Sequence, residues 1–111
     1  MQVSCCQNSL VASVTDPAMH ISLLTMELLI PWSHSLKDRR SAVRSLKDRL
    51  RSRFNASVAE VAYQDKWQRA TLAVCIVDSD RRKLEATMGR VRQLVEETHD
   101  LQVDDMRLEW L

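Results

Sequence analysis

Lysine and arginine side chains recur at helical spacing in residues 35–53, which read SLKDRRSAVRSLKDRLRSR. At about 100° per residue, five of them fall within an arc of roughly 80° on a helix. This basic stripe consists of Lys37, Arg40, Arg44, Lys47 and Arg51. Cations of this kind bind phosphate groups, and each contact releases counterions and makes binding sensitive to salt. The stripe predicts a polyanion-binding surface, with a solvated helix face or a protein contact as the alternative.

The charge of the chain is unevenly distributed, although its net value is only +1. Residues 36–53 contain eight basic and two acidic side chains, a balance of +6. Residues 96–111 contain six acidic side chains and one basic one, a balance of −5. Such a chain can present its basic side to a polyanion or to the acidic face of another protein.

Two tryptophans and one arginine lie beside predicted loops and are candidate contacts for a partner. Trp32 follows a proline, and Trp67 and Arg69 belong to the polar segment 64–69. Aromatic side chains at such positions can anchor a partner. A tryptophan that folds over a loop to close the core is the alternative, and the sequence leaves both interpretations open.

No group of residues predicts catalysis or metal binding. The three histidines are dispersed and the cysteines show no CxxC spacing, so neither type forms a metal-ligand pattern. A phosphate-cradling loop needs several glycines, and the chain has only Gly89. Glu27 lies in an apolar run, where a cation such as Arg69 or a subunit contact is favoured over acid–base chemistry. We expect no enzymatic activity, no cofactor, no metal and no small-molecule substrate.

The cysteines and the apolar pattern predict a cytoplasmic protein that does not bind membranes. Cys5 and Cys6 are adjacent, which strains a mutual disulfide, and Cys75 lies in an apolar run; a reducing compartment fits this usage. No run reaches the roughly 18 apolar residues of a membrane span. The N-terminus lacks the basic and apolar regions of a secretory signal.

The basic stripe depends on the helix that carries it, which we predict over residues 36–53. Ser35 is a suitable N-cap, with Asp38 three residues later. The apolar face of this helix consists of Leu36, Val43, Leu46, Leu50 and Phe54. A second helix is predicted with Ser79 as its cap and Asp80 in its first turn. Its apolar face consists of Leu84, Met88, Val91, Leu94 and Val95.

Four predicted strands alternate with these helices. Residues 20–30 and 70–78 are apolar on both faces, as in the middle of a sheet; a helix is the alternative for residues 20–30. Residues 57–63 form a hairpin with residues 70–78, and residues 102–110 alternate as an edge strand. The order βαββαβ predicts an α+β, ferredoxin-like sandwich, a four-stranded antiparallel sheet with two helices on one face. The two central strands contain no Phe, Tyr or Trp, which disfavours base stacking on the sheet.

Residues 19–111 form the predicted single domain. Residues 1–18 are polar and without periodicity, and we expect a flexible N-terminal extension or a protein that truly starts at Met19. The outer faces of the two central strands carry Ile21, Leu23, Ala73, Cys75 and Val77. This apolar surface predicts a homodimer or another protein contact as the alternative function.

Several runs of the sequence resemble the YlxP-like family of small bacterial proteins of unknown function. They are residues 35–40 (SLKDRR), 43–50, 53–61 (RFNASVAEV), Asp65 and residues 67–70 (WQRA). The resemblance covers residues 19–111 and implies a ferredoxin-like α/β sandwich but no catalytic residues. Genes of this family often lie near those for translation initiation and ribosome maturation factors, which is an association and not a mechanism. We expect a cytoplasmic binding module whose basic stripe contacts RNA or a ribosomal assembly intermediate.

Overall fold

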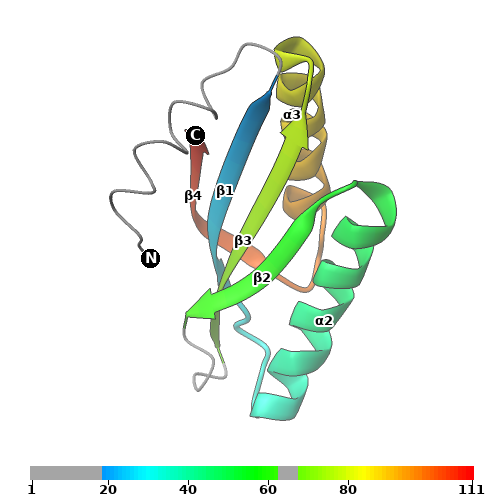
Figure 1. Ribbon diagram of the computed structural model, residues 1–111. Coiled ribbons are helices and arrows are strands. Elements are labelled where there is room, and N and C mark those ends of the chain that lie inside the picture. Colours follow the sequence, from blue (N-terminus) through cyan, green and yellow to red (C-terminus); the bar gives the residue numbers. More distant parts are fainter. Residues whose placement is uncertain (1–18, 63–67) are drawn as a thin grey trace.

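The computed structural model describes residues 19–62 and 68–111, which form one sheet and two helices (Figure 1). In chain order the elements are β1 (His20–Leu29), α2 (Leu36–Arg53), β2 (Ser57–Ala62), β3 (Arg69–Asp78), α3 (Arg81–Glu96) and β4 (Gln102–Trp110). The predicted order βαββαβ is confirmed, and residues 20–29 form a strand, not the alternative helix. The expected extension, residues 1–18, and the predicted contact Trp67 lie outside the described residues.

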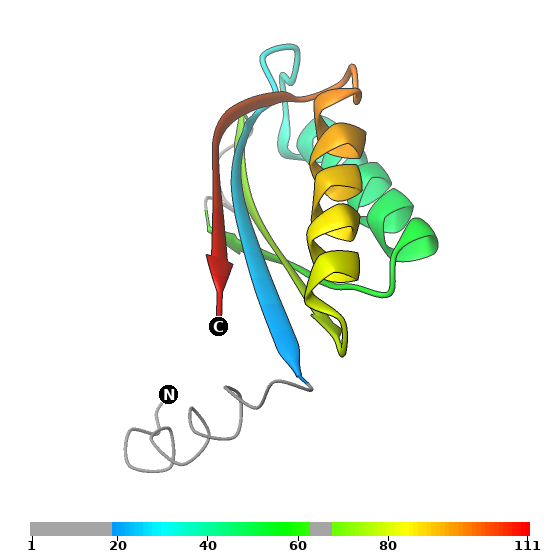
Figure 2. The same ribbon diagram turned by 90° about the horizontal axis from the view of Figure 1, so that it is seen from above.

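The four strands form one antiparallel sheet in the order β2–β3–β1–β4. The two apolar strands, β1 and β3, are therefore central, as predicted, since each pairs with a neighbouring strand along both of its edges. β4 lies at one edge, as its alternating pattern predicted, and β2 lies at the other. Figure 2 shows both helices on the same face of the sheet. The predicted ferredoxin-like α+β fold is confirmed.

The core lies between this face of the sheet and the two helices. Alternate residues of the central strands point into it and are buried, namely Ser22, Leu24, Met26 and Leu28 of β1 and Ala70, Leu72, Val74 and Ile76 of β3. The helices contribute Val43, Leu46 and Leu50 from α2 and Leu84, Met88, Val91, Leu94 and Val95 from α3. Each fully buried side chain of this size contributes about 1.5–3 kcal/mol, so the apolar faces hold both helices on the sheet.

The cap of α3 lies one residue later than the sequence predicted. Asp80, not Ser79, is the N-cap, and its carboxylate accepts hydrogen bonds from the backbone N–H groups of Arg82 at 3.0 Å and Lys83 at 3.3 Å. One carboxylate oxygen satisfies both donors, and its negative charge interacts favourably with the helix dipole. The prediction of Ser79 as the cap was therefore wrong by one residue.

A buried arginine connects α2 with the sheet. Arg39 exposes only 2% of its side chain and forms an ion pair with Glu60 of β2, which is 15% exposed. The Nε of Arg39 also donates to the backbone carbonyl of Arg69, at the start of β3, at 2.8 Å. The side chain of Arg69 pairs in turn with Glu27 of β1 at 2.9 Å and Asp104 of β4 at 3.3 Å. One connected set of polar contacts thus joins α2 to all four strands, and the predicted pairing of Glu27 with Arg69 is confirmed.

We expect Arg39→Ala to lower the free energy of unfolding by about 3–5 kcal/mol, because it leaves the Glu60 carboxylate without its buried partner. The matched control is Arg40→Ala, an exposed neighbour that we expect to change stability by no more than about 0.5 kcal/mol. Chemical denaturation monitored by circular dichroism measures both values. Equal stabilities of the two variants would show that the Arg39 contacts do not hold α2.

Candidate polyanion-binding surface

The helix that carries the basic stripe has the bounds that the sequence predicts, Leu36–Arg53. At its start, the Oγ of Ser35 accepts a hydrogen bond from the backbone N–H of Asp38 at 3.1 Å. The Asp38 carboxylate accepts the backbone N–H of His34 at 3.1 Å, which satisfies a second donor at this end. At its other end, two arginines in the last turn suit the negative pole of the helix dipole.

The buried face of α2 fixes the direction of the stripe. Val43, Leu46 and Leu50 pack into the core, so the helix cannot rotate without exposing them. The stripe is centred about 100° around the helix from this face, on the side of β2. The η-nitrogen of Arg51 confirms this placement, because it donates to the backbone carbonyl of Val58 in β2 at 2.8 Å.

The members of the stripe stay accessible. Four are exposed and Lys47 is half-buried. Within residues 19–62 and 68–111, no side-chain hydrogen bond or ion pair is made by Lys37, Arg40, Arg44 or Lys47. The acidic residues of α2 therefore leave these four charges without partners, and the surface carries a positive potential.

A shallow hollow of about 260 Å³ separates the stripe from β2. Arg40, Arg44 and Lys47 line it from α2, and Glu60 lines it from β2. The Glu60 carboxylate is paired with the buried Arg39, so its negative charge is offset at the point where an anion would approach. The hollow therefore offers three cations to a phosphate group from one side.

Of the predicted partner contacts, two lie within the described residues. The indole N–H of Trp32 donates to the backbone carbonyl of Asp100 at 2.7 Å and joins the loop before α2 to the loop before β4. Trp32 thus has the loop-closing role that was the alternative to a partner contact. Its side chain nevertheless remains 43% exposed. Arg69 is bound to Glu27 and Asp104 and stays partly accessible. Whether either residue contacts a partner stays a prediction.

The face of the sheet away from the helices carries the apolar set proposed for a protein contact. Ile21, Leu23, Ala73 and Cys75 are half-buried on this face. Val77 is 56% exposed, and Val61 of β2 adds another exposed side chain, at 54%. None of the described helices covers this face (Figure 2).

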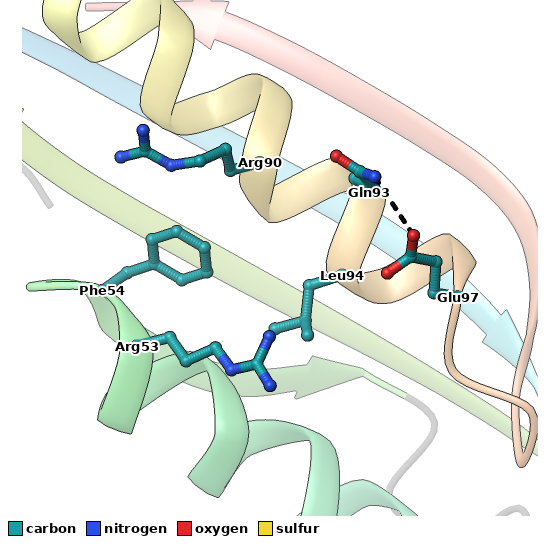
Figure 3. Close-up of a pocket in the computed structure, with 6 residues that line it drawn as sticks. All are labelled: Arg53, Phe54, Arg90, Gln93, Leu94 and Glu97. Carbon is teal, nitrogen blue, oxygen red and sulfur yellow. Dashed lines mark hydrogen bonds between the residues drawn. The ribbon is translucent and has the colours of Figure 1, made fainter.

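A second hollow, between the two helices, was not predicted. It has a volume of about 450 Å³ and is lined by Arg53, Phe54, Arg90, Gln93, Leu94 and Glu97 (Figure 3). The helical pattern of residues 36–53 placed Phe54 on the apolar face and gave Arg53 no role. Periodicity within one helix cannot show which residues of another helix it faces, so the sequence contains no signal for this juxtaposition.

Metal sites and membrane-spanning helices are both absent from the described part of the chain. It contains no group of three or more His, Cys, Asp or Glu residues that could hold a metal ion. Neither α2 nor α3 is long and apolar enough to cross a membrane.

Comparisons with known proteins identify relatives of the chain. Uncharacterized protein YlxP of Bacillus subtilis (strain 168) is 30% identical over 90 residues, which make up 81% of this chain and 98% of that protein. A crystal structure of a C-terminal segment of the alpha subunit of aIF2 from Pyrococcus abyssi matches with 12% identity and a TM-score of 0.36, too weak to carry an argument. That match covers 93% of this chain and 55% of the archaeal one. The model of a family described as "Protein of unknown function (DUF503)" matches residues 21–108. The chain belongs to this family, to which its motifs and its similarity to YlxP both point.

Proposed function

We propose that the protein is a cytoplasmic binding module that contacts RNA, alone or within a ribosomal particle, through the basic stripe of α2. The observation that carries the proposal is the set of four stripe cations without partners among the described residues. Other arginines of the chain, such as Arg39, Arg69 and Arg81, are paired with carboxylates. The stripe cations are therefore available to an external anion.

The dimensions of the stripe suit a nucleic-acid backbone. From Lys37 to Arg51 the helix rises about 21 Å, at 1.5 Å per residue. One strand of nucleic acid carries a phosphate about every 3.4 Å along a helix axis, so several consecutive phosphates can lie along the stripe. Arginine binds two oxygens of one phosphate at once, and Arg40 and Arg44 are placed for this at the rim of the hollow beside β2.

The rest of the fold also favours contact through the helix layer. Single-strand RNA readers of similar architecture stack bases on aromatic side chains of their central strands. β1 and β3 have no Phe, Tyr or Trp, so this mode is disfavoured here. The gene association implied by the family resemblance agrees with an RNA partner in translation.

We expect binding of a labelled single-stranded RNA to weaken steeply with salt. Five phosphate contacts give a slope of about −3.5 in a plot of log K against log salt concentration, at roughly 0.7 per contact. Arg44→Glu combined with Lys47→Glu reverses the charge of two side chains in the middle of the stripe. At low salt this variant should bind at least about 30-fold more weakly, since each lost contact costs about 1 kcal/mol or more. Fluorescence anisotropy measures these affinities.

The control for this experiment carries the same change in charge elsewhere. Arg82→Glu combined with Arg92→Glu alters two exposed residues of α3 and should weaken binding only a few-fold, through the overall charge. Circular dichroism checks that both variants are folded. Equal losses in the two variants, or wild-type binding that does not respond to salt, would contradict the proposed surface.

A second candidate function is homodimerisation through the face of the sheet away from the helices. The exposed Val77 and Val61 favour it, because apolar side chains gathered on one open face often mark a contact with another chain. At the side of this patch, β4 presents Arg107 and Glu109, both exposed. Two copies related by a two-fold axis can pair these opposite charges. The two functions are compatible, since a dimer would present two basic stripes.

Light scattering over a wide concentration range tests the dimer. The wild-type chain should have twice the monomer mass, and Val77→Lys should give monomers, because a charge replaces an exposed apolar side chain of the proposed interface. Ser45→Lys, an exposed change on α2, is the control and should leave the dimer intact. A wild-type chain that stays monomeric at every concentration rules out this candidate.

A further inference from the structure

The hollow between α2 and α3 holds an aromatic ring between two arginines. Figure 3 shows the ring of Phe54, which directly follows α2, between the side chains of Arg53 and Arg90. Phe54 is half-buried: it packs against the core and also lines the hollow of about 450 Å³. The hollow thus combines an apolar platform with cations from two different helices.

Both arginines are available to an external anion. Within the described residues, the side chain of Arg53 makes no hydrogen bond or ion pair, and the side chain of Arg90 donates only to the hydroxyl of Thr87, at 3.4 Å. The acidic residue of the hollow, Glu97, is engaged by the side-chain amide of Gln93 at 3.1 Å. Its carboxylate retains acceptor capacity, so this end of the hollow suits a group that donates hydrogen bonds, such as the edge of a nucleobase.

The hollow lies at the C-terminal end of α2, near the end of the basic stripe but on the other flank of the helix. Arg51, the last member of the stripe, precedes Phe54 by three residues, so the two lie on neighbouring turns at the C-terminal end of α2. A strand bound along the stripe reaches the hollow by crossing this end of the helix. Phe54 also supplies an aromatic ring in the helix layer, which the central strands lack on the sheet.

We infer that this hollow binds one unpaired nucleobase of a single-stranded RNA, stacked on Phe54, with Arg53 and Arg90 on the neighbouring phosphates. The inference rests on the proposed function and adds to it a preference for single-stranded over duplex RNA. Stacking suits the site because every base has a π face, and the loss of one stacked base weakens binding about fivefold or more. Bases in a duplex are already stacked and paired and cannot enter.

The test compares two ligands of equal charge by fluorescence anisotropy at one salt concentration. One is a labelled 12-nucleotide single-stranded RNA, and the other is a ribose-phosphate chain of the same length without bases. The wild-type protein should bind the base-bearing strand at least about fivefold more tightly. If both bind equally and with a steep salt dependence, this inference is wrong while the proposed function stands. If neither binds, the proposed function fails, and this inference fails with it.

Variants of the protein test whether the preference for the base-bearing strand arises at Phe54. Phe54→Leu keeps an apolar side chain against the core and should lower the affinity for the base-bearing strand to that of the abasic chain, without changing the latter. Arg90→Ala should lower the affinity for both ligands a few-fold. Its matched control, Arg92→Ala, lies on the opposite flank of α3 and should have no effect. A folded Phe54→Leu protein that still prefers bases overturns the assignment; if this variant does not fold, equal affinities of the Arg90 and Arg92 variants overturn it.

Discussion

The contacts of Arg39 with Glu60 and with the backbone carbonyl of Arg69 determine how α2 lies on the sheet. A buried arginine is tolerated only where its charge is paired and its donors are bound. The helix therefore cannot slide or rotate without leaving a charge unpaired in the core. Arg40 follows Arg39 directly, so the contact that holds the helix also sets the direction of the basic stripe. On the far side of the sheet, Arg69 holds β1 and β4 through Glu27 and Asp104, and the stripe consequently rests on a rigid support.

These contacts also join three of the sequence runs that resemble the YlxP-like family. Arg39 comes from the run SLKDRR, Glu60 from SVAEV and Arg69 from WQRA, and the fold brings the three runs together. Gln68 of the last run also donates to the backbone carbonyl of Ser33, in the loop before α2, at 3.3 Å. The residues that carry the resemblance thus have roles in building the fold. A function must be sought in the side chains that this construction leaves exposed, which is why the stripe and the interhelical hollow carry the proposals.

Patterns within single segments of the sequence predicted the helix and strand positions correctly. The bounds of α2, the alternation of β4 and the central place of β1 and β3 depend on periodicity and capping within one segment. Two adjacent residues, Ser79 and Asp80, could both cap α3, and periodicity does not choose between them. The burial of Arg39 was not predictable, because its partner Glu60 is 21 residues away and in another element. The hollow around Phe54 was missed for the same reason, since its lining comes from two helices.

We propose that the exposed cations of α2 bind RNA in the cell. The decisive experiment is purification of the tagged protein from cells that express it, with half of the lysate treated with nuclease. We expect ribosomal RNA or ribosomal particles to co-purify with the untreated sample and to be lost after nuclease treatment or a wash at high salt. Recovery of a protein partner equally with and without nuclease, in the absence of RNA, would contradict RNA binding by the basic stripe.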